Sequence, residues 1–163
     1  KTAATALAQT YYALTKKPII MLRPFLTYGP HQAPRLLVPS LIKKSLKNEK
    51  VDMTRGEQTR DLIYVEDVVN AYIKAAKTPE AHGEIINIGT GKETNIRFMA
   101  EKILELTKSK TKINFGAFPY REGEVMHFFS DVQKAKKTLK WEAKIDLVEG
   151  LKKTIVWYRE HEN

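Results

Sequence analysis

Residues 19–30 read Ile19-Ile20-Met21-Leu22-Arg23-Pro24-Phe25-Leu26-Thr27-Tyr28-Gly29-Pro30. The first four residues are an apolar run without alternation, which is typical of a strand covered on both faces in a parallel α/β sheet. Before this run, residues 2–16 are rich in strong helix formers, and Pro18 favours an extended chain because a proline disfavours helix in the residue before it. After the run, Gly29 and Pro30 break the chain into a loop. The stretch therefore predicts a helix that leads into a buried strand.

The rest of the chain continues this alternation of helices and strands. One amphipathic helix is predicted from apolar residues at spacing i, i+3, i+4, i+7 and i+8, which are Ile96, Met99, Ala100, Ile103 and Leu104. Asp131 is expected to cap a helix that ends near residue 139, and Asp146, with Glu149 three residues later, is expected to open the last helix. Further helices are expected at 37–47 and 65–76, and strands at 51–54, 61–65, 84–88, 113–115 and just before Asp131. This order predicts an α/β architecture with some antiparallel strands.

Composition restricts the class of protein. Of the 163 residues, 42% are hydrophobic, and the sequence contains neither a long uninterrupted apolar run nor a signal-peptide pattern. We therefore expect a soluble globular protein of the cytoplasm without a membrane partner. The absence of cysteine excludes disulfides and thiolate metal ligands, and the four scattered histidines predict no metal site.

The formal net charge of +9 favours anionic partners. The lysines lie mainly on the polar faces of predicted helices, where solvation explains them, and no zinc finger, helix-turn-helix or aromatic RNA-binding motif accompanies them. We therefore expect no nucleic-acid partner. A basic nucleic-acid-binding domain is kept as an alternative, which predicts an affinity that depends steeply on salt.

Four segments resemble, in order and spacing, the extended short-chain dehydrogenase/reductases that act on nucleotide sugars, which are NAD-dependent epimerases and dehydratases. The segments cover nearly the whole chain and are the Lys1 helix through Tyr28-Gly29-Pro30, Gly56-Glu57-Gln58-Thr59-Arg60-Asp61-Leu62-Ile63-Tyr64-Val65-Glu66-Asp67, Asn87-Ile88-Gly89, and Tyr120-Arg121-Glu122-Gly123-Glu124 with the following Asp131 helix. The resemblance implies the C-terminal part of a Rossmann-type parallel-sheet domain, residues 1–30 and 62–92. It also implies a small α/β substrate-binding domain, residues 31–61 and 93–163.

The resemblance assigns the substrate phosphates to two arginines. In the family, the residues that match Arg60 and Arg121 bind the diphosphate of the nucleotide sugar, and a carboxylate that matches Glu124 accepts hydrogen bonds from the ribose. A guanidinium group suits this role because it forms bidentate, charge-assisted hydrogen bonds to phosphate oxygens. Without the resemblance, Arg60 followed by Asp61 is typical of a surface ion pair of little energetic value, and Glu124 of an ordinary loop carboxylate.

The resemblance also places part of a cofactor site. Lys1 matches the lysine of the YxxxK motif, whose tyrosine precedes the sequence. Its ammonium is implied to hold the nicotinamide ribose of NAD or NADP and to lower the pKa of that tyrosine, the base that removes a proton from a sugar hydroxyl. Pro24 and Phe25 are implied to lie at the nicotinamide, beyond the carboxyl end of a parallel strand. Without the resemblance, Lys1 is an ordinary first residue and Pro24 simply terminates a strand.

Two implied substrate-binding positions depart from the family pattern. Leu26 stands where many relatives have an asparagine that bonds the substrate, and Met53 matches a position near the nucleobase that is often aromatic. The sequence therefore leaves open the base, the sugar, the choice between NAD and NADP, and the reaction.

The function that these features favour is the C-terminal portion of an NAD(P)-dependent nucleotide-sugar epimerase, 4-ketoreductase or dehydratase. We expect the chain to be inactive alone, because the dinucleotide fingerprint and the catalytic tyrosine lie upstream of Lys1. A non-catalytic sugar-nucleotide-binding module is the alternative. The strands at 19–22 and 84–88 are expected to leave a sheet edge or an apolar face exposed. A homodimer is also expected, through small residues of the first helix, namely Ala3, Ala4, Ala6 and Ala8.

Overall fold

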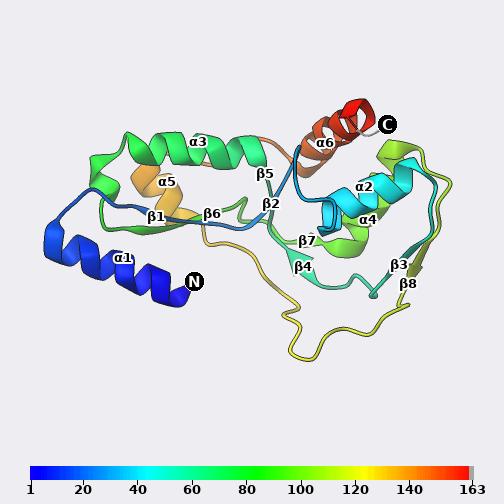
Figure 1. The fold of residues 1–163 in the computed structure, drawn as a ribbon, viewed down its shortest axis with the longest axis horizontal. Helices are drawn as coiled ribbons and strands as arrows, with labels where there is room; N and C mark the ends of the chain where they lie inside the picture. The colour runs from blue at the N-terminus through cyan, green and yellow to red at the C-terminus, as the bar shows by residue number, and fades with distance from the viewer. Residues whose placement is uncertain (162–163) are drawn as a thin grey trace.

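Two parallel strands, β1 (Met21–Pro24) and β6 (Ile85–Ile88), lie at one end of the molecule, with Met21 opposite Ile85 and Pro24 opposite Ile88. The computed structural model describes residues 1–161. Helix α3 (Val65–Ala76) lies on one side of this pair and α1 (Thr2–Thr15) on the other, as Figure 1 shows. Helix α5 (Gln133–Leu139) and the short 3-10 helix η1 (Pro79–Ala81) pack beside α3. This end of the fold is a parallel sheet fragment with helices on both sides.

The other end of the molecule contains three further strand pairs. Strands β2 (Leu26–Tyr28) and β5 (Leu62–Tyr64) pair in parallel, as do β3 (Val51–Met53) and β8 (Ile113–Phe115). The third pair, β4 (Thr59–Arg60) and β7 (Thr94–Asn95), is antiparallel. Three helices pack together against these strands: α2 (Leu37–Leu46), α4 (Ile96–Thr107) and α6 (Leu147–His161). The predicted α/β class is confirmed, including its antiparallel part.

The buried side chains form two clusters. The first joins α2, α4 and α6 to β2, β3 and β5 and includes Tyr28, Ile42, Met99 and Leu151. The second joins α3, β5 and β6 to α5 and the segment after it. Its largest member, Trp141, is 3% exposed. The segment 93–163 therefore contributes to both clusters, because α5 packs on α3 and β6. The division into two domains stays a prediction. Helix α5 lies in the segment assigned to the substrate-binding domain, but it packs on the sheet fragment.

Most predicted elements form within a few residues of their expected bounds. The strand expected at 19–22 begins at Met21 and continues to Pro24, because Met21 N donates to Glu84 O at 2.9 Å and the ladder to β6 starts there. The cap at Asp146 forms as predicted, with Glu149 N donating to Asp146 Oδ1 at 2.8 Å.

Two predictions near Asp131 were wrong. The residues before it do not form a strand, although Thr59 N donates to Met126 O at 2.7 Å and Asp61 N to Phe128 O at 3.1 Å. These bonds run in one direction only and do not build a ladder. Asp131 is also not the N-cap of α5, which is Val132. Its carboxylate accepts instead from Gln133 N at 2.9 Å, the local turn that aspartate side chains favour.

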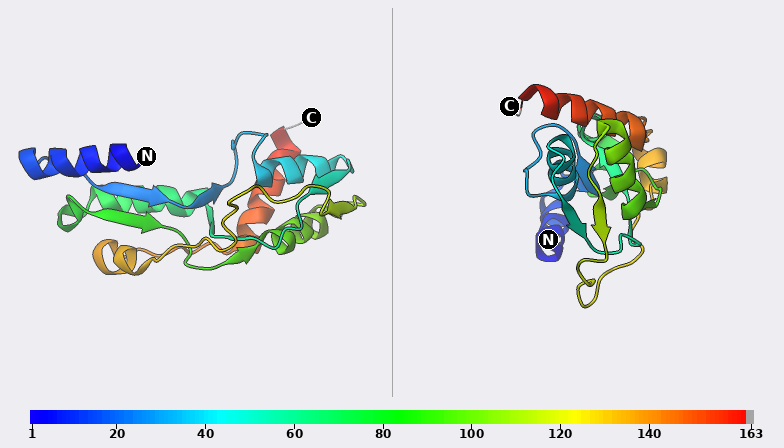
Figure 2. Two further views of the ribbon diagram at one scale, coloured as in Figure 1. Left: turned by 90° about the horizontal axis from the view of Figure 1, so that it is seen from below. Right: turned by 90° about the vertical axis from the view of Figure 1, so that its right-hand side faces the viewer.

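Apolar surface is exposed on α1. This helix buries none of its residues, and Leu7 and Leu14 are 72% and 80% exposed. Both views in Figure 2 place α1 at the margin of the fold, and Tyr12 packs against Gly83. Within residues 1–161, β1 pairs only with β6, so its second edge is free. None of the helices in these residues is both long and apolar enough to cross a bilayer.

Candidate active site

A cavity opens where β1 and β6 end. It has a volume of about 520 Å³, and we call it the strand-end cavity. Directly after β1, Phe25 N donates to Ile88 O at 2.9 Å. Residues 24–26 form part of the cavity wall. Its lining is Arg23, Pro24, Phe25, Leu26, Arg60, Asn87 and Phe128. Four predicted site residues, Pro24, Phe25, Leu26 and Arg60, thus meet in one cavity at the carboxyl ends of parallel strands, where ligands bind in open α/β sheets.

A second cavity lies on the far side of Leu26 and Arg60. It has a volume of about 270 Å³, and we call it the inner cavity. Its lining is Leu26, Thr27, Tyr28, Gln32, Leu36, Leu37, Val38, Gln58, Arg60 and Ile96. Leu26 and Arg60 line both cavities, so the space at the strand ends and the space at the helical end of the fold adjoin at these two residues.

The Arg60 guanidinium is held by three oxygen atoms. Its Nη2 donates to Glu124 Oε1, and its Nη1 donates to Thr59 O at 2.7 Å and Val125 O at 2.8 Å. Both side chains of the ion pair are 21% exposed. Glu124 was predicted to bind ribose, and here it neutralises the arginine that was predicted to bind phosphate. An anionic ligand at Arg60 would therefore meet the negative charge of Glu124 as well.

The buried side chain of Asp61 connects the segments that surround Arg60. Its carboxylate is fully buried. It accepts five hydrogen bonds, from Thr90 N at 2.8 Å, Thr90 Oγ1 at 2.6 Å, Gly91 N at 3.0 Å, Ser130 N at 3.1 Å and Ser130 Oγ. One side chain thus joins the start of β5, the turn after β6 and the segment before α5. Charge-assisted bonds to a buried carboxylate are strong, so Asp61 positions the neighbouring Arg60.

The segment 120–130 lies along β4 and is attached at several points. Glu57 N donates to Tyr120 Oη at 2.9 Å, and the rings of Phe128 and Phe25 stack with centroids 5.0 Å apart. The Glu93 carboxylate accepts from Thr59 Oγ1 at 2.7 Å and lies 3.0 Å from His127 Nδ1. The hydrogen bonds from His127 and then Thr59 lower the pKa of Glu93. These contacts hold Phe128 at the strand-end cavity and keep the segment that contains Glu124 beside Arg60.

Four predicted site residues do not line either cavity: Lys1, Met53, Arg121 and Glu124, the last of which pairs with Arg60. Lys1 is exposed, and Arg121 lies exposed in the turn in which its carbonyl accepts from Glu124 N at 3.1 Å. Met53 is 8% exposed in the core and pairs with Phe115 across β3 and β8. Their binding roles stay predictions.

Sequence reasoning did not select most of the residues that line the cavities; the polar and aromatic ones among them are Arg23, Thr27, Tyr28, Gln32, Gln58, Asn87 and Phe128. Arg23 precedes Pro24, and Asn87 belongs to a motif of the family resemblance, so both had a usable signal. Phe128 had none, because its contact with Phe25 joins segments about a hundred residues apart. Tyr28 lines the inner cavity, but burial and then the neighbouring Tyr64 raise its pKa, and its hydroxyl donates to Leu147 O at 3.2 Å. A raised pKa and a bonded hydroxyl make Tyr28 unsuited to act as a general base.

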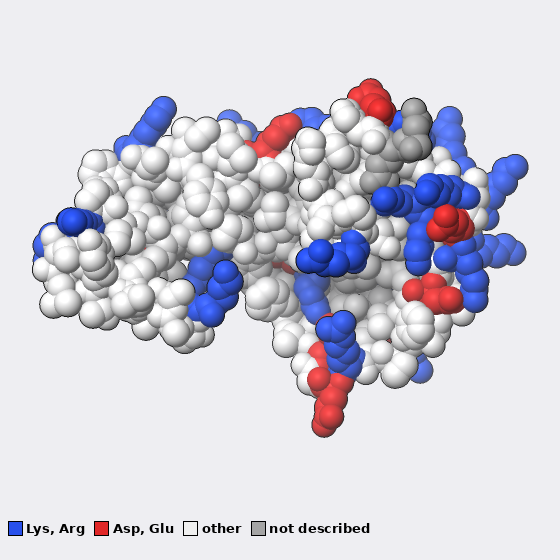
Figure 3. All heavy atoms as spheres, viewed as in Figure 1, with Lys and Arg blue, Asp and Glu red and all other residues white. Residues whose placement is uncertain are grey.

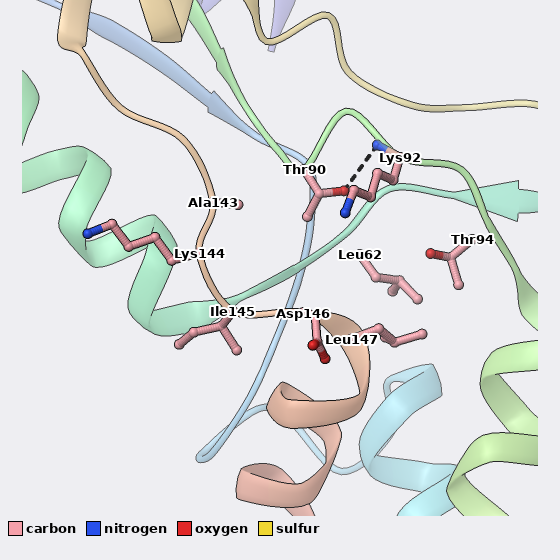
Figure 4. Close-up of a pocket in the computed structure, with 9 residues that line it drawn as sticks. All are labelled: Leu62, Thr90, Lys92, Thr94, Ala143, Lys144, Ile145, Asp146 and Leu147. Carbon is pink, nitrogen blue, oxygen red and sulfur yellow. Dashed lines mark hydrogen bonds between the residues drawn. The ribbon is translucent and has the colours of Figure 1, made fainter.

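Other charged regions lie away from these cavities. A space of about 120 Å³ between the turn after β6 and the start of α6 shares no residue with them. In Figure 4, the side chain of Lys92 points into this space and that of Lys144 points away.

Lysines and arginines gather over the end that contains α2, β3 and β8, to the right in Figure 3, with acidic groups among them, such as Asp52 at 3.1 Å from Lys50. The residues that the structure describes contain no group of three potential metal ligands.

A parallel strand pair with helices on both sides and a cavity at the carboxyl ends of the strands is typical of Rossmann-type α/β proteins, in which ligands bind at that edge. Comparison with known families identifies the family. Residues 1–89, more than half of the chain, match the model of the NAD dependent epimerase/dehydratase family, and the chain belongs to this family. The resemblance found in the sequence is therefore confirmed.

Individual relatives agree. The dTDP-D-glucose 4,6-dehydratase of Bos taurus is 34% identical over 167 residues, which cover 99% of this chain and 46% of that protein. The UDP-glucuronate 4-epimerase of Thermodesulfobacterium geofontis is 32% identical over 163 residues, with 99% and 49% covered. The structure of UDP-glucose 4-epimerase from Thermotoga maritima with UDP-glucose superposes with a TM-score of 0.93 at 30% identity, covering 100% of this chain and 53% of that one. The chain thus spans about half the length of these enzymes.

Proposed function

We propose that this chain is the C-terminal portion of an NAD(P)-dependent nucleotide-sugar epimerase, 4-ketoreductase or 4,6-dehydratase, and that it binds the nucleotide-sugar substrate. The observation that supports this most directly is the position of Arg60 in the wall common to the strand-end and inner cavities. A nucleotide sugar has two uncharged ends joined by a diphosphate. Two cavities that adjoin at one arginine match that order of parts.

In this proposal the sugar lies in the strand-end cavity and the nucleoside in the inner cavity. The sugar lies at Pro24 and Phe25 because it exchanges a hydride with the nicotinamide, which this proposal places beyond the carboxyl ends of the strands. The diphosphate binds Arg60 after Glu124 releases it, and Glu124 then accepts hydrogen bonds from the ribose. Arg121, in the same turn as Glu124, supplies a second guanidinium to the diphosphate. Leu26, at the boundary, packs against the substrate, while Met53 contributes from the core near the base.

The residues of this chain fit one end of a nicotinamide cofactor. Helix α1 runs antiparallel to β1, so the amino terminus lies toward the carboxyl end of the strands (Figure 1). Lys1 is exposed there, and Pro24 and Phe25 form the strand end. When bound, NAD or NADP accepts and returns a hydride. Lys1 would hold the nicotinamide ribose and favour the phenolate of a tyrosine supplied from outside this sequence. No glycine-rich turn connects a strand directly to a helix in residues 1–161, and in this proposal the dinucleotide phosphates bind outside this sequence.

The exposed surfaces fit an incomplete protein. The free edge of β1 and the unburied α1 would be covered by an upstream half or by a second copy of the chain, as a homodimer, and we place the whole protein in the cytoplasm. A non-catalytic sugar-nucleotide-binding module remains the second candidate, because both cavities lie within this chain while the catalytic tyrosine does not.

Calorimetric titration with UDP, dTDP, CDP and GDP sugars tests the proposal. Replacing Arg60 by lysine keeps the charge but removes the bidentate geometry, so we expect affinity to fall roughly tenfold. Arg159→Lys is the matched control, since Arg159 lies on α6 outside both cavities. Failure of every nucleotide sugar to bind, or equal affinities for the two variants, contradicts the proposal.

A further inference from the structure

The segment 117–124 carries Arg121 and Glu124 and is fixed at both ends. In Figure 1 it is part of the long loop between β8 and α5. Just before it, Gly116 N donates to Met53 O at 3.0 Å, and just after it, Met126 O accepts from Thr59 N at 2.7 Å. The position of Arg121 between these two points depends on the contacts of the segment itself.

Two side chains form hydrogen bonds or ion pairs between the segment 117–124 and the rest of residues 1–161. Glu124 pairs with Arg60. The Tyr120 hydroxyl accepts from Glu57 N at 2.9 Å and donates to Glu57 Oε2 at 3.3 Å. All residues of the segment except Tyr120 and Glu124 are exposed. Tyr120 and Glu124 are therefore its two points of attachment.

The Tyr120 hydroxyl is bonded to a rigid part of the fold. Three successive carbonyl oxygens, those of residues 56–58, accept hydrogen bonds from the start of α4; the donors are Arg97 N at 2.8 Å, Asn95 Nδ2 at 3.1 Å and Ile96 N at 3.0 Å. Gly56 has a φ of +73°, and a side chain there would meet the Arg97 backbone at 3.0 Å. Since α4 belongs to the first buried cluster, Glu57 is a fixed point for Tyr120.

Arg121 directly follows Tyr120 and shares a turn with Glu124. In this turn Glu124 N donates to Arg121 O at 3.1 Å. The α-carbons at the two ends of a four-residue turn lie within about 7 Å of each other. The turn therefore keeps Arg121 near the place where the segment contacts Arg60, and in the proposed function both guanidinium groups bind one diphosphate.

We infer that Tyr120 is a positioning residue for Arg121, and that its bonds to Glu57 hold the turn beside Arg60 while the diphosphate takes the place of Glu124. The inference rests on the proposed function, in which the ligand releases Glu124 from Arg60. Of the two attachments, the one at Tyr120 then remains, because it involves no group assigned to the ligand. A turn that is already ordered loses less conformational entropy when Arg121 binds the ligand.

Isothermal titration with inorganic pyrophosphate tests the inference in the wild type, Tyr120→Phe, Arg121→Gln and the double variant. Phenylalanine keeps the ring but removes the hydroxyl. Tyr120→Phe should weaken pyrophosphate binding roughly fivefold, about 1 kcal/mol, the net contribution of one hydrogen bond. In the Arg121→Gln background the same substitution should leave the affinity unchanged, because no guanidinium remains to be positioned. A merely structural role of Tyr120 would give no such coupling between the two residues.

Tyr72→Phe is the control, since Tyr72 lies on α3, is 52% exposed and lines neither cavity. Hydrogen exchange of the Glu57 amide checks the contact without a ligand and should be faster in Tyr120→Phe than in the wild type.

The inference is overturned by unchanged exchange of the Glu57 amide, by wild-type pyrophosphate affinity in either single variant, or by equal losses from Tyr120→Phe in both backgrounds. Each of these results leaves the assignment of Arg60 to the diphosphate in place. A wild type that binds neither pyrophosphate nor any nucleotide sugar contradicts the proposed function itself, and the inference with it.

Discussion

The Arg60–Glu124 ion pair predicts that one substitution increases the affinity for pyrophosphate. In Glu124→Gln the side chain keeps its shape but loses the negative charge that neutralises Arg60. Two unit charges about 5 Å apart interact by roughly 3 kcal/mol at an effective dielectric constant near 20. Measured ion pairs at solvent-exposed sites give at most about 1 kcal/mol. Because both side chains are 21% exposed, we expect a value between these limits, about 1.4 kcal/mol, or a tenfold gain in affinity.

Inorganic pyrophosphate is the appropriate ligand because it has no ribose. Glu124 is also proposed to bind the ribose, so a complete nucleotide would gain at Arg60 and lose at Glu124. Isothermal titration at two salt concentrations measures the effect, which should shrink as salt screens the charges. Glu122→Gln is the control, since Glu122 is exposed two residues earlier in the same turn. Unchanged or weaker pyrophosphate binding by Glu124→Gln, with Glu122→Gln like the wild type, refutes the proposed competition for Arg60.

Three further predictions follow from other contacts. Asp61→Asn places an amide N–H against groups that donate to the carboxylate, so the free energy of unfolding measured with urea should fall by about 3 kcal/mol. The control, Asp131→Asn, changes an exposed aspartate and should have little effect. Equal losses in the two variants contradict the role of Asp61. Since contacts in the folded state lower the Glu93 pKa, they stabilise the protein above the unfolded-state pKa of this group, and this stability is lost as pH falls through the folded-state pKa. Thermal midpoints between pH 6 and pH 3 should therefore fall less in Glu93→Gln than in the wild type, and parallel curves contradict this. If α1 forms the dimer interface, Leu14→Glu should lower the mass that sedimentation measures at high protein concentration. A wild-type chain that is monomeric at this concentration contradicts the proposed interface.

Local sequence patterns predicted the regular elements well. The helix at 96–107 follows from spacing alone, since four of its five predicted apolar positions are buried. The strand before Pro24 was displaced by two residues, because its register depends on Glu84 and β6 rather than on its own apolar run. The segment before Asp131 looked like a strand and is extended, but it lacks the reciprocal bonds of a ladder.

The candidate site was only partly predictable. Arg60 and Glu124 were both selected from the family resemblance, but their ion pair was not predicted, because the two residues lie 64 positions apart in the sequence. The five bonds to Asp61 depend on tertiary contacts, because their donors lie 29 to 69 residues away in the sequence.

A crystal structure of the chain with a bound CDP-sugar or UDP-sugar tests the central role of Arg60 most directly. Our account predicts diphosphate oxygens within hydrogen-bond distance of the Arg60 guanidinium, Glu124 turned away from Arg60, the base in the inner cavity and the sugar in the strand-end cavity. A nucleotide bound elsewhere, with the Arg60–Glu124 pair intact, contradicts it.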